Sequence, residues 1–246
     1  MHVSDVYTLR DKPVLVTGAS SGIGQAVALA CAQAGARVVL HGRDPDRLQA
    51  SWQALPGDGH QVLQGDLQNQ DAVMALADQC PTLHGVVHCA GIDGVAPMRL
   101  VQSEMLLRVF QVNYIAPMTL TQRLLLKKKV QSGGSILFMS SIAANTGRAG
   151  VGPYSGSKAA LLGSMRPLAL EVAKHGIRVN ALCPGIVRTP IFSGQEQWLT
   201  DEVEKSYPLG LGEPEDVAHA SVFFLSDASR KITGTAFSID GGVPLT

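Results

Sequence analysis

The stretch "PVLVTGASSGIG", residues 13–24, runs from a β-branched apolar segment directly into a glycine-rich turn. Such a run predicts a buried strand, then a tight turn, then the start of a helix. Its glycines let the backbone come close to a ligand, and the N–H groups at a helix start can bind phosphate. Gly18, Gly22 and Gly24 are spaced G-x-x-x-G-x-G, which is not the G-x-G-x-x-G dinucleotide pattern. The stretch therefore indicates a phosphate-binding turn, with a flexible connector as the alternative.

Strands and helices alternate in the same way along the rest of the chain. Short β-branched runs predict strands at 13–17, 37–41, 61–65, 85–90, 135–140, 177–183 and 236–240. Helical patterns lie between them at 22–34, 45–54, 69–79, 103–129, 152–175 and 214–226. This alternation is typical of a parallel sheet covered by helices on both faces. We expect one doubly wound α/β domain over residues 1–246, with a seven-stranded, mostly parallel sheet. Segment 190–208 fits neither pattern and is expected to form a flap over the site.

Composition and charge argue against several kinds of partner. The 246 residues are 46% hydrophobic and carry 20 basic and 20 acidic side chains, so the formal net charge is zero. A neutral chain lacks the basic footprint that is typical of nucleic-acid binding. The start "MHVSDVYTLRDK" is too polar for a secretory signal. The chain also contains no apolar run of about 18 residues, so we expect no membrane span.

The cysteines are far apart, and none forms a CxxC pair. They are Cys31, Cys80, Cys89 and Cys183. This spacing predicts neither a zinc site nor a disulfide framework. We therefore expect no bound metal, reduced thiols and a cytoplasmic location.

The segment "YSGSK", residues 154–158, places a tyrosine and a lysine four positions apart with only small residues between them. On a helix, positions i and i+4 lie on the same face, so Tyr154 and Lys158 would point into the same space. An ammonium beside a phenol stabilises the phenolate and makes the tyrosine a better proton donor and acceptor near neutral pH. Taken alone, the pair also fits an ordinary surface helix.

Six short motifs follow one another along the chain. They are "TGASSGIG" (17–24), "HCAG" (88–91), "VN" (112–113), a serine at 141, "YSGSK" (154–158) and "PG" (184–185). Ser141 precedes Tyr154 by 13 residues, and Asn113 precedes it by 41. In this order and spacing the chain resembles the short-chain dehydrogenase/reductase family over essentially its whole length. Its overall pattern is similar to the 3-oxoacyl-carrier-protein reductases of that family. The resemblance implies a Rossmann-type fold and a nicotinamide-dependent oxidoreductase.

The resemblance also implies four catalytic residues. Tyr154 would be the general acid/base that exchanges a proton with the substrate oxygen. Lys158 would lower the pKa of Tyr154 and hydrogen-bond the nicotinamide ribose. Ser141 would hold the substrate oxygen, with its neighbour Ser140 as the rival for this role. Asn113 would anchor a water behind Lys158 and complete a proton relay.

The cofactor-binding residues implied by the resemblance come from six parts of the chain. They are Gly18, Ser20, Ser21, Gly22, Ile23, Gly24, Arg43, Asp66, Leu67, Ala90, Gly91, Tyr154, Lys158, Pro184, Gly185, Val187 and Thr189. Asp66 and Leu67 match the pair that contacts adenine in the family.

The second predicted strand ends in "VVLHGRD", residues 38–44, and this ending bears on the choice of cofactor. NAD-binding sheets commonly place an acid here to bond the ribose 2′-hydroxyl, whereas an arginine fork matches a 2′-phosphate. Here Arg43 follows His41 and Gly42. Asp44, the nearest acid, precedes a proline and has the features of a helix N-cap. We expect NADP(H) rather than NAD(H); the other interpretation of Arg43 is an exposed loop charge.

These features predict an NADP(H)-dependent carbonyl reductase or alcohol dehydrogenase. The first hypothesis for the substrate is a 3-oxoacyl thioester, carried by acyl carrier protein or coenzyme A. The alternatives are a sugar, a polyol or another small secondary alcohol. A different class would be a regulatory protein that binds the cofactor without turnover, against which the four catalytic residues argue.

Three features leave alternatives open. Lys127–Lys129 would be either solvated charges at a helix end or a docking patch for an acidic carrier protein. Arg148 would face either an acidic substrate group or the solvent. His88 stands where the family commonly has asparagine, and we expect a buried residue rather than a titrating catalyst.

Helices 103–129 and 152–175 carry apolar residues around much of their circumference. A helix that is apolar on more than one face must bury the second face elsewhere. In the family these helices pair between subunits, so we expect a homotetramer. Pro167 lies inside the second helix and is expected to kink it.

Overall fold

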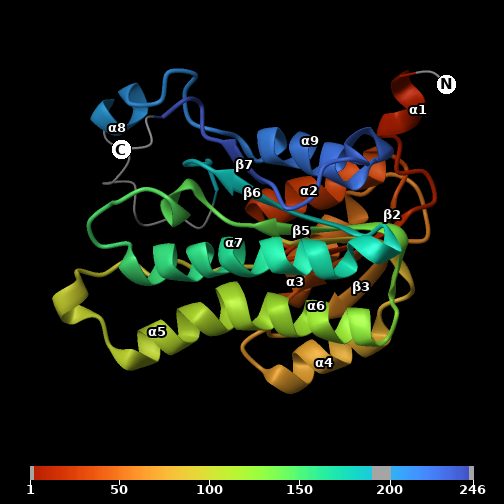
Figure 1. Cartoon of the computed structure of the whole chain (residues 1–246), viewed down its shortest axis with the longest axis horizontal. Helices are drawn as coiled ribbons and strands as arrows, with labels where there is room; N and C mark the ends of the chain where they lie inside the picture. Colours follow the sequence, from red (N-terminus) through yellow and green to blue (C-terminus); the bar gives the residue numbers. More distant parts are fainter. Residues whose placement is uncertain (1–2, 190–200, 244–246) are drawn as a thin grey trace.

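Seven parallel strands form the centre of the molecule (Figure 1), as the apolar runs predict. The computed structural model describes residues 3–189 and 201–243. The strands are β1 (Pro13–Thr17), β2 (Arg37–Gly42), β3 (Gln61–Gln64), β4 (Leu83–His88), β5 (Val130–Met139), β6 (Arg178–Pro184) and β7 (Ala236–Ile239). Their order is β3-β2-β1-β4-β5-β6-β7, and every neighbouring pair is parallel. The expected fold class is confirmed, with a sheet that is wholly rather than mostly parallel.

Helices cover both faces of the sheet (Figure 1). They are α1 (Val3–Tyr7), α2 (Gly22–Gln33), α3 (Pro45–Gln53), α4 (Gln70–Gln79), α5 (Ser103–Phe110), α6 (Ala116–Leu126), α7 (Gly152–Val172), α8 (Asp201–Lys205) and α9 (Pro214–Leu225). Buried residues of α2, α3 and α9 pack on one face, and those of α4, α6 and α7 pack on the other. On β1, Leu15 points to the second of these cores while Val14 and Val16 point to the first. A strand with both faces buried is apolar at every position, which explains the continuous run in the sequence.

The helix expected at 103–129 is divided by a π-helical turn, η2 (Gln111–Ile115), between α5 and α6. Single π turns inside α-helices are frequent at functional sites. Pro117, four residues after Asn113, has no N–H to donate to the Asn113 carbonyl. Asn113 itself is buried, with 1% of its surface exposed. The proline therefore accounts for a local departure from α-helix at the motif asparagine.

Two further expectations from the sequence concern the helix that contains Pro167 and the flap at 190–208. Helix α7 continues through Pro167 from Gly152 to Val172, so this proline does not end the helix. Most of the expected flap at 190–208 lies outside the described residues. Its last part contains α8 and then Tyr207, a buried side chain beside the site.

The strand order reverses between β1 and its two neighbours, because β2 lies on one side of β1 and β4 on the other. In open α/β sheets, ligands bind outside the carboxyl ends of the strands at such a switch point. The fold therefore places the glycine-rich turn after β1 and the end of β4 at one crevice.

Candidate active site

Two adjoining hollows open at the carboxyl ends of the strands. The first, the dinucleotide groove, has a volume of about 490 Å³ and is bounded by the β1–α2 turn and the ends of β2, β3 and β4. The second, the reaction pocket, has a volume of about 440 Å³ and contains Ser141, Tyr154 and Lys158. Ile23, Cys89, Gly91 and Thr189 line both hollows, so the two are continuous. Every cofactor-binding residue expected from the sequence lines one hollow or the other.

The glycine-rich turn lines the groove, and two of its glycines lie where a larger residue would not fit. Gly18 has φ +69°, and a Cβ on it would lie 2.8 Å from the Ala90 Cα. A Cβ on Gly24 would lie 2.2 Å from the Gly18 carbonyl oxygen. Ser21 is the N-cap of α2, and within the described residues its side chain makes no capping hydrogen bond. The first N–H groups of α2 are therefore available to a ligand phosphate, which fits the diphosphate of a dinucleotide.

Arg43, Asp66 and Leu67 line the far end of the groove, as expected for an adenosine site. Asp44 accepts a hydrogen bond from the Arg47 amide at 3.1 Å and is the N-cap of α3, which confirms the interpretation of this acid as a cap. The Gln64 side chain donates to the Arg43 carbonyl at 3.1 Å and ties the loop to β3.

The groove residues that the sequence reasoning missed include three long polar side chains, His41, Arg47 and Gln68. Arg47 follows Arg43 by four positions on the turn that begins α3. This spacing was the available signal for a second cation at the same end of the groove.

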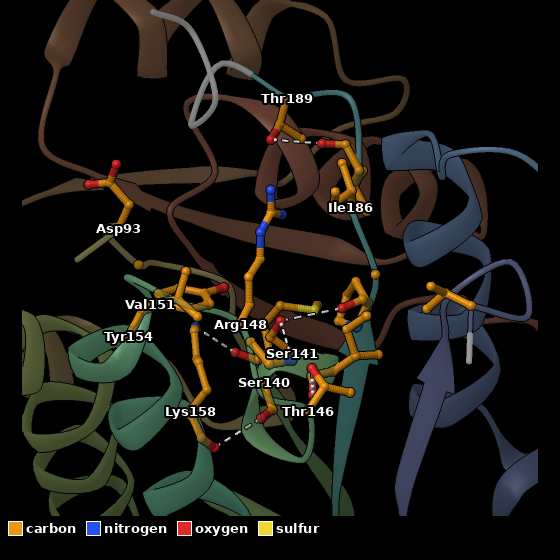
Figure 2. A pocket seen from close by; sticks show the side chains of 18 of the residues that line it. Asp93, Ser140, Ser141, Thr146, Arg148, Val151, Tyr154, Lys158, Ile186 and Thr189 are labelled. Atoms are coloured by element: carbon orange, nitrogen blue, oxygen red, sulfur yellow. Dashed lines mark hydrogen bonds between the residues drawn. The ribbon is translucent and has the colours of Figure 1, made fainter. Parts of the chain in front are cut away.

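Tyr154 and Lys158 lie on the first turns of α7 and face the reaction pocket together (Figure 2). The Lys158 ammonium lies 5.6 Å from the centroid of the Tyr154 ring and donates to the Met139 carbonyl at 2.8 Å. Lys158 is only 4% exposed, and its desolvation lowers its pKa to about 8. The side chain thus keeps its positive charge at neutral pH.

The two neighbouring serines point to different partners. Ser140 donates to the Lys158 carbonyl at 2.9 Å and so holds β5 against the helix backbone. Ser141 donates to the Pro184 carbonyl at 3.4 Å and accepts from the Ala143 amide at 3.2 Å, and it is close enough to the Tyr154 hydroxyl to lower its pKa. The structure therefore brings Ser141, rather than Ser140, to the tyrosine hydroxyl.

The pKa of Tyr154 is raised, opposite to the direction expected from its lysine neighbour. Burial of the phenol is the largest cause, the hydrogen bond from Ser141 acts against it, and the charge of Asp93 adds to it. Lys158 is not among the causes of this shift, and its ammonium donates to the Met139 carbonyl. Like an unperturbed tyrosine, the phenol is protonated at neutral pH and has a proton to donate.

Asn113 lies behind the pocket and lines neither hollow. Its amide donates to the Ile92 carbonyl at 2.9 Å and to the Ser157 hydroxyl at 3.0 Å, and its oxygen accepts from the Ile92 amide at 2.8 Å. A Cβ on Gly91 would lie 3.4 Å from both the Asn113 oxygen and the Lys158 nitrogen. The Asn113 side chain thus clamps the chain after β4 against α7, close to Lys158.

The outer part of the reaction pocket combines apolar walls with two charged side chains. The walls include Val95, Ile142, Val151, Ile186, Val203 and Tyr207. Figure 2 shows Arg148 extending through the pocket toward Thr189, with Asp93 on the far side of Tyr154. Arg148 is exposed and also lines the pocket. Its position therefore agrees with both interpretations from the sequence, in which it faces the solvent or an acidic substrate group.

Three residues considered from the sequence have structural contacts. His88 hydrogen-bonds the Thr121 hydroxyl at 2.8 Å and stacks on Phe138, and burial lowers its pKa to about 3. It is a buried core residue, as expected. Lys127 pairs with Asp78, and Lys129 donates to the Asp78 and Cys80 carbonyls at the end of α4. These contacts favour an interhelix role for both lysines over a docking patch.

None of the helices in residues 3–189 and 201–243 is long and apolar enough to cross a membrane. In the same ranges no three His, Cys, Asp or Glu side chains are grouped as a metal site would require.

The comparisons with known proteins agree with this geometry. Residues 18–244 match the family model described as enoyl-(acyl carrier protein) reductase. The (3R)-3-hydroxyacyl-CoA dehydrogenase of Canis lupus familiaris is 35% identical over an alignment of 254 positions that covers 96% of this chain and 97% of the relative.

Two solved structures are similar over nearly the whole chain. A short-chain type dehydrogenase/reductase from Mycobacterium marinum has a TM-score of 0.92 and 31% identity, with 100% of both chains covered. A structure from Agrobacterium tumefaciens with bound NADP, provisionally assigned as a 2-deoxy-d-gluconate 3-dehydrogenase, has a TM-score of 0.87 and 30% identity, covering 97% of this chain and 98% of that one. The chain therefore belongs to the short-chain dehydrogenase/reductase family and is an oxidoreductase that acts on CH–OH groups with a nicotinamide cofactor.

Proposed function

We propose that the protein is an NADP(H)-dependent reductase of 3-oxoacyl thioesters. The observation that carries the reaction is the meeting of Ser141, Tyr154 and Lys158 in a pocket continuous with the dinucleotide groove. When bound, the nicotinamide cofactor supplies the hydride to the carbonyl carbon or accepts it from the alcohol.

The chain's own residues manage the proton and the substrate oxygen. In the reducing direction Tyr154 donates its phenolic proton to the carbonyl oxygen, which becomes the hydroxyl, while Ser141 hydrogen-bonds the same oxygen. Tyr154 is protonated at neutral pH and can serve as the general acid in this step. Lys158 is buried and cationic, and it would hydrogen-bond the nicotinamide ribose of the bound cofactor. Asn113 holds α7 in register with the chain after β4 and so positions Tyr154 and Lys158.

NADP(H) is proposed over NAD(H) because the end of the groove beyond β2 is lined by Arg43 and Arg47. Two guanidinium groups match the charge of a 2′-phosphate. Asp44, the nearest acid, uses its side chain as a helix cap. The NADP-bound relative supports the same choice.

The substrate class follows from the pocket walls. An apolar outer pocket suits an acyl chain, and the hydroxyacyl-CoA dehydrogenase and the family model point to thioesters. Coenzyme A or an acyl carrier protein would carry the acyl group. The second candidate is a sugar or hydroxy acid, which Arg148 in the pocket lining favours.

A substrate panel tests the proposal. NADPH oxidation is followed by absorbance with 3-oxoacyl thioesters of two chain lengths, with keto sugar acids and with neutral ketones. We expect the highest kcat/KM for a thioester. A keto acid that exceeds every thioester, with loss of that advantage in Arg148→Ala, would select the second candidate. NADPH binding without turnover of any substrate would support a regulatory protein instead.

We also propose a homotetramer in the cytoplasm. Leu107 on α5 and Leu170 on α7 are 69% and 80% exposed, and both helices lie on the same side of the sheet (Figure 1). Exposed leucines on adjacent helices suit burial against a second copy. Cys31, Cys80 and Cys183 are buried free thiols, which suits a reducing compartment. Sedimentation velocity at micromolar concentration should show a species of about four chains, and a monomer would contradict the proposal.

A further inference from the structure

Tyr207 lines the reaction pocket just after α8, and it has no part in the proton transfer. Its side chain is 7% exposed, whereas Arg148 on the same pocket is exposed. Exposed side chains lie where a pocket opens to solvent, and buried ones lie along its interior. Tyr207 therefore belongs to the inner wall of the reaction pocket.

Two glycines leave the space that the Tyr207 ring occupies. A Cβ on Gly185 would lie 2.9 Å from the ring carbon Cε1, and a Cβ on Gly241 would lie 3.5 Å from its neighbour Cδ1. One edge of the ring thus lies against the backbone of two segments that are far apart in the sequence. The ring cannot move further in that direction, because backbone closes the way.

Hydrogen bonds on both sides of the ring keep it in this position. The Tyr207 hydroxyl oxygen accepts from the Ile186 amide at 3.2 Å. The Tyr207 amide donates to the Glu204 carbonyl at 3.1 Å, and the Tyr207 carbonyl accepts from the Gly210 amide at 2.9 Å. Glu204 also forms an ion pair with Arg188 at 3.0 Å. A substrate in the pocket therefore meets a fixed ring rather than a side chain that rotates away.

The segments that hold Tyr207 also supply apolar side chains to the same pocket. They contribute Ile186, Val203 and Val243. Burial raises the pKa of the Tyr207 phenol, so the ring is uncharged at neutral pH. An uncharged ring among branched apolar side chains suits contact with a hydrocarbon chain.

We propose that Tyr207 limits the length of the acyl chain that the reaction pocket accepts, with its ring at the end of the space for that chain. This inference rests on the proposed reduction of 3-oxoacyl thioesters and names the residue that selects among them. A chain that stops short of the ring gains about fourfold in kcat/KM for each CH₂ that it buries. A longer chain must leave its end outside the pocket or displace a ring that is held on both sides.

The test compares the chain-length profiles of the wild type, Tyr207→Ala and Tyr207→Phe. NADPH oxidation is followed with acetoacetyl-, 3-oxohexanoyl-, 3-oxooctanoyl- and 3-oxododecanoyl-coenzyme A. The measured quantity is the ratio of kcat/KM for the longest chain to that for the shortest, in which any loss common to all substrates cancels. Tyr207→Ala should raise this ratio about tenfold or more, as two further buried CH₂ groups imply. Tyr207→Phe keeps the ring and should keep the wild-type ratio.

The phenylalanine variant separates the size of the ring from its hydrogen bond. If Tyr207 only anchored the backbone at Ile186, both variants would lower kcat/KM by the same factor for every chain length, and that result would overturn the inference. Tyr114→Ala is the matched control, because Tyr114 bonds Ser164 outside both hollows. It removes a ring of the same size and should leave the ratio unchanged.

Tyr207→Leu covers the case in which the alanine variant does not fold. Leucine fills the inner part of the space and leaves out the far end of the ring, so the ratio should rise about fourfold, as one further buried CH₂ implies. An unchanged ratio in this variant would overturn the inference.

A series of methyl ketones from butanone to 2-dodecanone separates the inference from the proposed function, because these ketones carry the same chains without a thioester. A wild type that reduces only the ketones, with the expected shift in Tyr207→Ala, would remove the proposed substrate and support the inference. Thioester reduction with the same ratio in the wild type and Tyr207→Ala would leave the function and overturn the inference. A wild type that reduces neither series would overturn both.

Discussion

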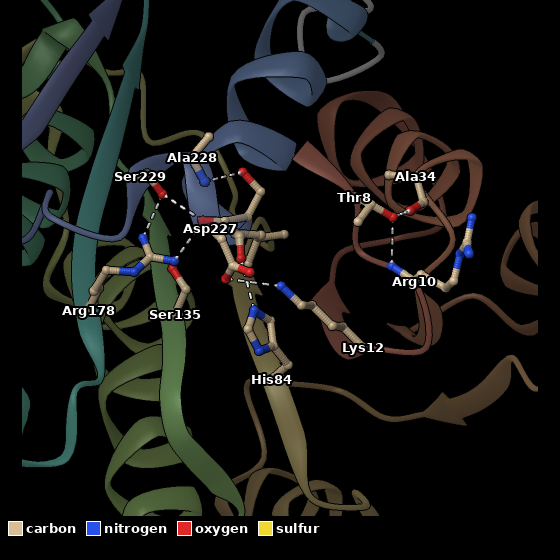
Figure 3. A network of polar contacts seen from close by, with 12 residues as sticks. Thr8, Arg10, Lys12, Ala34, His84, Ser135, Arg178, Asp227, Ala228 and Ser229 are labelled. Carbon is tan, nitrogen blue, oxygen red and sulfur yellow. Dashed lines mark hydrogen bonds and ion pairs between the residues drawn. The ribbon is translucent and has the colours of Figure 1, made fainter. Parts of the chain in front are cut away.

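At the amino-terminal edge of the sheet, buried polar groups are paired with one another (Figure 3). Arg178, only 6% exposed, donates to the Phe224 carbonyl and the Ser229 hydroxyl at 2.7 Å each, and to the Ser226 carbonyl at 3.2 Å. His84 Nε2 bonds the Leu225 carbonyl at 2.9 Å. A carbonyl can only accept, so Nε2 carries the proton. Together these side chains satisfy the last carbonyls of α9 and place a cation at the negative end of its dipole.

At the carboxyl edge of the sheet, some buried polar groups have no hydrogen-bond partner in the described residues. The three buried side-chain atoms without a partner in the described residues are both ring nitrogens of His41 and the Ser155 hydroxyl, which adjoins Tyr154. Lys158 is buried with a lowered pKa and no carboxylate among the causes of its shift. The buried polar side chains at the amino-terminal edge therefore stabilise the fold, whereas those at the carboxyl edge serve ligand binding.

The largest effect that would test the comparison is expected at Tyr154. Tyr154→Phe should lower kcat by about 10²–10⁴-fold, the usual loss for a positioned acid or base, while NADPH affinity stays within a small factor. Stopped-flow reduction and a fluorescence titration measure the two quantities. The matched control is Tyr114→Phe, whose hydroxyl bonds Ser164 outside both hollows. A Tyr154→Phe enzyme with near wild-type kcat would show that Tyr154 is not the proton donor.

At the opposite edge, Arg178→Ala should lower the free energy of unfolding by about 2–4 kcal/mol, because three charged hydrogen bonds in the interior are lost. Urea titration measures this loss, and kcat/KM of the folded fraction should not change. Arg123→Ala is the control, since its ion pair with Asp78 is exposed and should contribute about 0–1 kcal/mol. Equal losses in the two variants would contradict the role assigned to the amino-terminal edge.

A smaller effect concerns the cationic end of the groove. Arg43→Ala should weaken NADPH by about 10- to 100-fold, the equivalent of the 1.5–3 kcal/mol that a charged hydrogen bond contributes. NADH affinity should remain nearly unchanged, because it lacks the 2′-phosphate. Both cofactors are titrated against the same protein by fluorescence, so NADH is the internal control. Equal weakening of the two would assign Arg43 to the loop rather than to the phosphate.

The smallest effect is a difference in acid stability. Burial lowers the pKa of His41 to about 4 and that of His88 to about 3, below the value of about 6.5 in the unfolded chain. The unfolded state therefore takes up protons first, so the stabilising contribution is complete above pH 6.5 and is lost as the pH falls toward 4. Between pH 7 and 5.5 each of these histidines should cost about 1 kcal/mol. His41→Leu should lose about 1 kcal/mol less than the wild type over this range in urea titrations; an identical loss would mean that His41 titrates normally.

Elements that depend on local pattern could be predicted from the chain alone. The seven apolar runs became the seven strands of the sheet, and the helices between them begin and end within a few residues of their expected bounds, apart from the division at 111–115. Asp44 before Pro45 was interpreted correctly as a helix cap because capping is decided within four residues. Tyr154 and Lys158 share a helix face for the same reason.

Contacts between distant segments could not be predicted from periodicity. Ser140 and Ser141 are adjacent, and only the packing of β5 against α7 decides that Ser141 meets the tyrosine. The pKa of Tyr154 depends on how deeply the phenol is buried and on where Lys158 directs its ammonium, which is a carbonyl 19 positions earlier in the chain. Pro117 was an available signal for the π turn at Asn113 and was not used.

The sequence by itself therefore determined the doubly wound sheet, the glycine-rich turn and the positions that carry the family's chemistry, because these follow from the spacing of residue types along one strand or one helix. Only the tertiary structure decided which buried polar groups are paired. Arg178 and His84 meet the end of α9, 46 and 141 residues away in sequence, and are satisfied. His41 lies in the wall of the groove and is not. In the sequence all three are polar residues on apolar strands, and the free energy of burying each depends on partners that only folding brings near.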